Sequence, residues 1–131
     1  MEQRETQGLL LSLLEDSGVP FQNEQGLVRF RFRQQGMVWE TACRCQKDQV
    51  VAYGRYPFPV EKGKALGLCN QFNQQLAQGS FFEQQGQVVY RNRADLQDPY
   101  DARQRLAGCL EQNAGVIVRY WGGFSQAAQQ Q

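Results

Sequence analysis

The four cysteines have the most versatile chemistry in this chain, because thiolates bind zinc and take part in redox reactions. They are Cys43, Cys45, Cys69 and Cys109. Structural zinc sites usually place two or more residues between paired cysteines, and the Cys43-x-Cys45 pair has one. On a strand these two side chains would lie ~6.6 Å apart with parallel Cβ vectors, which is unsuited to a disulfide. The spacing favours buried structural thiols, with a cysteine-based zinc site or redox chemistry as the alternatives.

The chain contains no histidine. This removes the usual general base, the Ser-His and Cys-His nucleophile pairs and every histidine-containing metal site. The acids with a possible role stand where helices are expected to start, and capping and the helix dipole account for them; they are Glu61, Asp95, Asp98 and Asp101. Neither a P-loop nor a dinucleotide-binding fingerprint is present. We therefore expect a protein that is not an enzyme and that uses no cofactor.

A row of arginines could bind an acidic segment or phosphates. Residues 27–33 alternate between apolar and basic side chains, which is the period of a half-buried strand. The basic side chains of this strand and of the two that follow are Arg29, Arg31, Arg33, Arg44 and Arg55. Such a row is more often the solvated face of a sheet, paired across the strands with an acid such as Glu40. Both interpretations stay open, and the candidate partner-binding residues are Arg29, Arg31, Arg33 and Arg44.

Three helices and five strands are expected to position these residues. The predicted helices cover residues 2–16, residues 60–78 and a long segment that starts at Asp98-Pro99. The predicted strands cover residues 27–33, 37–45, 49–56, 80–83 and 88–91. The order α-β-β-β-α-β-β-α predicts an α+β fold, in which helices pack mainly on one face of an antiparallel sheet. Because no linker or repeat interrupts its 131 residues, we expect a single domain over residues 1–131.

Two of the predicted helices contain asparagine or glycine residues whose role has more than one interpretation. The central helix has an apolar stripe of Ala65, Leu68, Cys69, Phe72 and Leu76. Beside it, Asn70 and Asn73 either cap a strand edge or form a dimer contact. In the last helix Asn113 is expected to be a satisfied buried amide. There Gly108, Gly115 and Gly122 recur every seventh residue, which indicates either close approach of another backbone or a loosely formed helix end.

Charge and hydropathy limit the kinds of partner. Fourteen basic and thirteen acidic side chains give a formal net charge of +1, which provides no general attraction to nucleic acid or to an anionic membrane. The aromatic side chains are predicted to face inward, so they offer no stacking platform for single strands. The leucine-rich N-terminal segment is flanked by acids and is too short to span a membrane or to act as a signal peptide. We therefore expect a cytoplasmic protein that binds neither nucleic acid nor membrane.

Residues 70–91 carry a pattern that is found in a known family. It comprises Asn70 and Asn73 on a helix, then Gly79-Ser80-Phe81, a turn with Gly86, and Val88-Val89-Tyr90-Arg91. With this pattern the chain resembles the YbjN-like family, within the type III secretion chaperone-like fold. The resemblance implies a bacterial, non-enzymatic protein that is often homodimeric and that binds other polypeptides or acts as an accessory factor.

We therefore expect a homodimeric, chaperone-like accessory protein that binds a protein partner. The alternative is a small regulatory or structural dimer without chaperone activity. The candidate dimer contacts are Leu66, Asn70, Asn73, Gly108 and Gly115.

Overall fold

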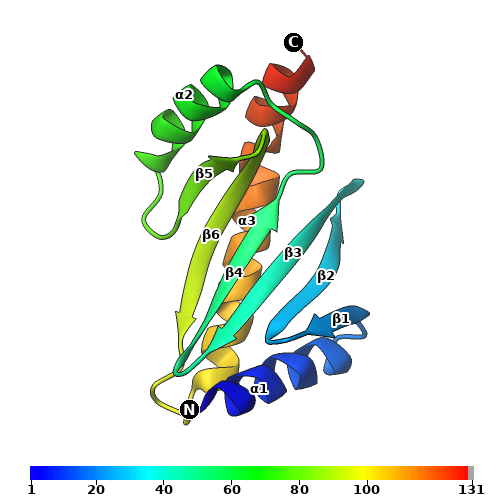
Figure 1. The fold of residues 1–131 in the computed structure, drawn as a ribbon, viewed down its shortest axis with the longest axis vertical. Coiled ribbons are helices and arrows are strands. Elements are labelled where there is room, and N and C mark those ends of the chain that lie inside the picture. Colours follow the sequence, from blue (N-terminus) through cyan, green and yellow to red (C-terminus); the bar gives the residue numbers. More distant parts are fainter. Residues whose placement is uncertain (130–131) are drawn as a thin grey trace.

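The computed structural model describes residues 1–129, which form three α-helices and a six-stranded antiparallel sheet (Figure 1). The helices are α1 (Gln3–Asp16), α2 (Lys62–Asn73) and α3 (Ala102–Gln129). The strands are β1 (Phe21–Glu24), β2 (Leu27–Gln34), β3 (Met37–Gln46), β4 (Gln49–Arg55), β5 (Ser80–Gln84) and β6 (Gln87–Asp95). Their order in the sheet is β1-β2-β3-β4-β6-β5. The predicted α+β class is confirmed, and the predicted elements follow one another as expected.

Strand β1 was not predicted. It is short, and Phe21 is the one apolar side chain in it. A two-residue turn with positive φ at Gln25 and Gly26 returns the chain so that Phe21 pairs with Phe30 of β2. The ladder with β2 therefore makes this segment a strand, and its own sequence has too little alternation to indicate one.

Helix α2 is shorter than predicted, because it ends at Asn73 and not at residue 78. The side-chain amide of Asn73 donates to the Phe81 carbonyl at 3.0 Å and accepts from the Phe81 N–H at 2.7 Å. Asn73 thus caps the edge of β5, the first of the two roles considered for it. The N–H of Gln75 bonds back to Phe72, which tightens the last turn. Leu76 consequently lies outside the helix, although it still packs against the core.

Helix α3 starts at Ala102, so the predicted start at Asp98-Pro99 is wrong. The Asp98 carboxylate accepts from the Tyr100 N–H at 3.0 Å, which closes a separate turn before the helix. Asp101 directly precedes the helix, and its carbonyl accepts a hydrogen bond from the Arg105 N–H at 3.0 Å.

The glycines of α3 break neither the helix nor the fold around it. The helix runs unbroken past all three of them. In the described part of the chain, a Cβ added at Gly108, Gly115 or Gly122 would meet no atom within 4 Å. Neither a loose helix end nor a close backbone among residues 1–129 accounts for them, and all three lie on the exposed side of α3.

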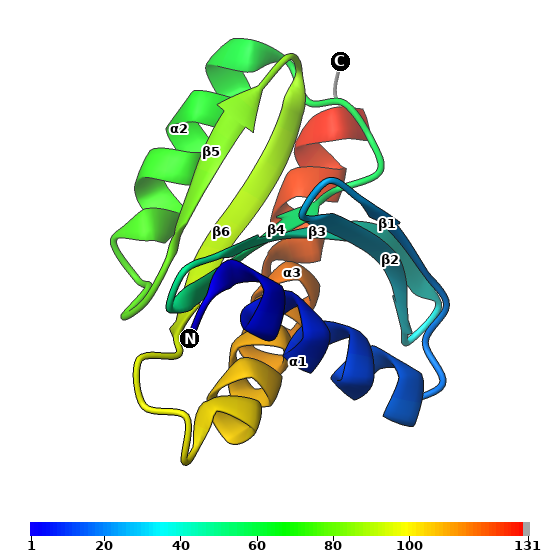
Figure 2. The same cartoon turned by 60° about the horizontal axis from the view of Figure 1, so that its bottom comes forward.

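The helices cover one face of the sheet, as predicted. Helix α1 packs Leu10 and Leu14 against β2 and β3 in one apolar cluster. Helix α2 and the second half of α3 pack against β5 and β6 in a second cluster, which contains Phe81 and Phe124. Figure 2 shows α1 and α3 on the same side of the sheet. None of the helices in residues 1–129 covers the opposite face of the sheet.

Asn113 is fully buried where α3 crosses β4 and β6. Its Nδ2 donates to Asn92 Oδ1 at 2.9 Å and to the carbonyls of Ala52 and Tyr90 at 3.3 and 3.4 Å. Its Oδ1 has no hydrogen-bond partner among residues 1–129. The expected buried amide is therefore satisfied on its donor side. The Asn92 amide continues the network to the Cys109 carbonyl and to Gln112.

Candidate functional site: the arginine face

Seven arginines project from the uncovered face of the sheet, because they occupy alternate strand positions whose neighbours point toward the helices. They are Arg29, Arg31 and Arg33 on β2, Arg44 on β3, Arg55 on β4, and Arg91 and Arg93 on β6. All seven are exposed. We call these arginines, with the outward-facing residues between them, the arginine face.

The four candidate partner-binding arginines lie together on this face. In the ladder between β2 and β3, Arg44 stands opposite Leu27, next in line to the row of Arg29, Arg31 and Arg33. Arg55 on β4 stands opposite Glu40 in the ladder between β3 and β4 and lies on the same side, as the sequence pattern suggested.

Arg91 closed the predicted last strand and Arg93 lay beyond it, and neither was proposed as a site residue. β6 runs on to Asp95, and its outward positions alternate with buried ones as far as Ala94. The alternation of apolar and polar residues could have indicated the full length of β6. The polar Asn92 occupies a buried position and interrupts this pattern in the sequence. An asparagine can hold such a position here because the α3 network satisfies it.

Basic side chains outnumber acidic ones on the arginine face. Three acids share the surface, namely Glu24, Glu40 and Asp95, so cations are in excess. Glu40 stands opposite both Arg31 and Arg55, yet within residues 1–129 no ion pair involves an arginine of this face. The expected cross-strand pairing with Glu40 is therefore not formed in the described part of the chain. Arg91 instead lies over the Phe82 ring, 5.9 Å from its centroid.

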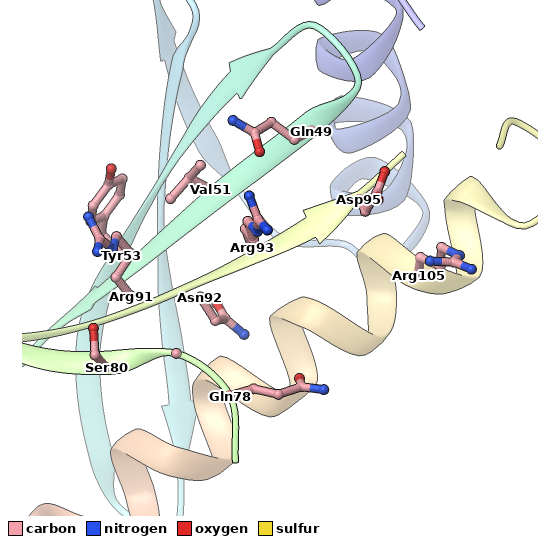
Figure 3. Close-up of a pocket in the computed structure, with 11 residues that line it drawn as sticks. Gln49, Val51, Tyr53, Gln78, Ser80, Arg91, Asn92, Arg93, Asp95 and Arg105 are labelled. Carbon is pink, nitrogen blue, oxygen red and sulfur yellow. The ribbon is translucent and has the colours of Figure 1, made fainter. Parts of the chain in front are cut away.

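A first hollow of about 670 Å³ lies over β4 and β6 (Figure 3). Arg91 and Arg93 line it from β6, Tyr53 from β4, and Ser80 from the start of β5. Arg105 of α3 stands at its far end, where Asp101 holds its guanidinium at 2.8 Å. The hollow is thus a polar, cationic depression.

A second hollow of about 410 Å³ lies over β2, β3, β4 and β6. The apolar side chains that line it include Ala42, Val89 and Tyr53, which we call its floor. The charged side chains that line it are Arg29, Arg44, Arg55 and Glu40, which we call its rim. This central hollow thus combines apolar side chains with three cations and one acid.

The cysteines do not form a common site. Cys43, Cys45 and Cys109 belong to the cluster under α1, whereas Cys69 belongs to the other cluster. Burial raises the pKa of Cys45 and of Cys69 to about 11 and that of Cys109 to about 12. Among residues 1–129 no group of three or more histidine, cysteine, aspartate or glutamate side chains is arranged to hold a metal ion. All four cysteines are free thiols that stay protonated near neutral pH.

We expect the four thiols of the folded protein to be unreactive toward a disulfide reagent at about pH 8, and to react fully once urea unfolds the chain. Their folded pKa values lie above the ordinary value of about 8.5, so protonated thiols stabilise the fold below that pH. This stabilisation is lost as the pH rises through the folded values. Absorbance of the released thiolate measures the reaction, with a small thiol as the control. Fast reaction of the folded chain would contradict the burial.

The candidate dimer contacts occupy different parts of the helix layer. Leu66, at 50% exposure, and Asn70 lie on the outer side of α2. Gly108 and Gly115 lie on the exposed side of α3. The side chain of Asn73 is instead engaged with β5. A dimer contact at these positions stays a prediction.

The fold of the chain has a counterpart among solved protein structures. It matches no protein-family profile and no curated protein. Its structure is similar to the crystal structure of YbjN from E. coli, described as "a putative transcription regulator", with a TM-score of 0.61 and 14% sequence identity. The similarity covers 84% of this chain and 84% of YbjN. No helix in residues 1–129 is both long and apolar enough to cross a membrane. The similarity confirms the predicted resemblance at the level of structure: the chain has a YbjN-like fold.

Proposed function

We propose that this protein acts without catalysis, as a chaperone-like accessory protein that binds an acidic polypeptide on the arginine face. The observation that carries the proposal is the set of seven exposed arginines, none of which forms an ion pair within residues 1–129. A guanidinium binds a carboxylate through two parallel hydrogen bonds. Since the arginines stand on a paired sheet, their backbones are already ordered, and a partner has less conformational freedom to remove on binding.

The acids of the chain support a role in binding rather than in catalysis. Glu61 accepts from the N–H groups of Gly63 and Lys64 at the start of α2, and these hydrogen bonds lower its pKa. Asp95 accepts from the Gln97 N–H at 3.0 Å, and Asp98 closes the turn before α3. These carboxylates thus have local structural roles.

We expect the variant R29S/R31S/R33S to bind a fluorescent dodecamer of glutamate about ten- to hundredfold more weakly than the natural protein. Each exposed charge pair contributes up to about 1 kcal/mol, and three are removed. Fluorescence anisotropy at low and high salt measures the affinity, and the remaining binding should depend less on salt.

The matched control is R4S/R103S/R119S, which removes the same charge from exposed positions on α1 and α3. It should bind the acidic peptide as the natural protein does. If both variants bound the peptide equally weakly, the loss of affinity would be an effect of net charge and not of the arginine face. If the natural protein did not bind the peptide, the proposal would be wrong.

The proposal includes a homodimer formed through the exposed sides of α2 and α3. We expect light scattering to give about twice the chain mass of 15.0 kDa over a hundredfold concentration range. L66E and G115E place a charge on these sides without a clash inside the chain at Gly115, so each should yield a monomer. A natural protein that is a monomer throughout would remove the dimer but leave the arginine face as it is. A dimer that fails to delay aggregation of an unfolded client would favour the regulatory or structural alternative.

A further inference from the structure

We propose that the central hollow selects, among acidic partners, a segment that also carries one bulky apolar side chain. The inference rests on the proposed function, because it assigns the chemistry of the segment that the arginine face would bind. The hollow would receive the apolar side chain, and the surrounding arginines would hold the acids on either side of it.

The strand register explains why a hollow exists at this point. Ala42 of β3 stands opposite Arg29 on one side and Tyr53 on the other, so a methyl group lies between two large side chains. On β6, which lies beside β4, Val89 stands opposite Arg55 of β4 and opposite Phe82 of β5. The small side chain of Ala42 leaves space that a longer residue would fill. This space is part of a depression of about 410 Å³ that Ala42 lines.

The floor and the rim of the hollow differ in chemistry. Ala42 and Tyr53 are half-buried and therefore provide the apolar surface of the floor, whereas Val89 beneath them is 2% exposed. Arg29, Arg44 and Arg55 come from three adjacent strands and line the hollow together with Glu40, so its rim has three cations and one acid. Neighbouring strands lie ~4.8 Å apart, so these cations are spread over ~10 Å across the strands. A short peptide with acids on both sides of one apolar residue matches this arrangement.

The apolar floor would add to the affinity that the charges provide. Covering exposed apolar surface with a Leu or Phe side chain removes both surfaces from water. The gain corresponds to an affinity increase of about tenfold or more. Guanidinium groups alone would not distinguish one acidic segment from another, since each carboxylate offers them the same geometry. The floor therefore provides the selectivity and the rim provides the attraction.

The observations favour a peptide over a single-stranded nucleic acid. Binding of single strands needs a series of exposed rings on which bases can stack. The Phe82 ring is engaged by Arg91, which leaves Tyr53 as the ring that lines both hollows. Glu24, Glu40 and Asp95 are distributed over the same face, where they would repel a phosphate backbone. Carboxylates interspersed with apolar side chains can avoid these acids, whereas a regular chain of phosphates cannot.

The experiment measures the binding of three labelled nonapeptides to the full chain by fluorescence anisotropy. The first has acids around a central Phe, the second has the same acids around a central Ser, and the third has glutamines around the Phe. We expect the first to bind about tenfold more tightly than the second, and the third to bind weakest. A labelled dT dodecamer is the fourth probe, and it should bind more weakly than the first peptide.

Two variants fill the hollow while leaving every arginine in place, namely A42L and A42Q. Each should remove the preference for Phe over Ser and retain the affinity for the Ser peptide. V38L is the control, because Val38 stands opposite Arg33 on the same face but outside the hollow. Circular dichroism shows whether each variant is folded. If A42L does not fold, A42Q is used for the binding measurement.

The outcomes separate this inference from the proposed function. Equal binding of the Phe and Ser peptides would overturn the hollow as a selective site and leave the acidic partner standing. No binding of either acidic peptide would overturn both proposals. Equal or tighter binding of the glutamine peptide, or tighter binding of the dT dodecamer, would assign the face to a different class of ligand and overturn the inference.

Discussion

Replacement of Gly79 by alanine is expected to lower the free energy of unfolding by about 2–5 kcal/mol. Gly79 has φ +70° at the turn into β5, a conformation in which any side chain is strained. A Cβ there would lie 2.5 Å from the Arg91 carbonyl oxygen and 2.7 Å from Cζ of Tyr90. The Tyr90 hydroxyl cannot move aside freely, since it donates to the Gln78 carbonyl at 2.8 Å and accepts from Gln112 at 2.9 Å. The backbone of β5 or of β6 must shift instead.

Gly86 provides the matched control for this prediction. It has φ +82° in the turn between β5 and β6, and a Cβ there would meet no atom within 4 Å in the described chain. G86A should therefore show the conformational penalty alone, about 1–2 kcal/mol. Urea unfolding followed by tryptophan fluorescence gives both free energies. Equal losses in the two variants would mean that the contact with Tyr90 and Arg91 is unimportant.

Elements with a strong local period could be predicted from the sequence. The alternation in residues 27–33 placed Arg29, Arg31 and Arg33 on one side of a strand, and β2 has them there. The apolar face of the first helix likewise gave α1 within one residue. In both cases one side of the element meets the core and the other meets water, so the pattern in the sequence reflects the environment directly.

Features that depend on residues distant in the sequence could not be predicted. The end of α2 is set by the Asn73 amide, which exchanges hydrogen bonds with Phe81 across a turn. The length of β6 depends on Asn92, a polar residue in a core position that α3 satisfies. Arg93 lies beyond Asn92, so the extent of the arginine face followed from this long-range network.

The same network joins the sheet to α3. Asn113 lies 21 residues from Asn92 and 61 residues from Ala52, and it binds both. On β4, Gly54 leaves the space that Asn113 occupies, because a Cβ at Gly54 would lie 2.5 Å from Asn113 Oδ1. This buried amide therefore links α3 to both β4 and β6, two of the strands that carry the arginine face.

We expect N113D to be less stable at neutral pH than N113A, which itself should lose about 2–4 kcal/mol. An aspartate would place an acceptor where Nδ2 now donates to three oxygen atoms, in a position with no exposure. Burial and these oxygens favour the protonated carboxyl, so its folded pKa would rise above the unfolded value of about 3.9. Stability that depends on this proton is lost as the pH rises through the folded pKa, so N113D should become more stable from about pH 7 to pH 5. Urea unfolding at both pH values measures this gain relative to N113A, which has no carboxyl at the site. A constant difference between the two variants would contradict a buried, desolvated position for this side chain.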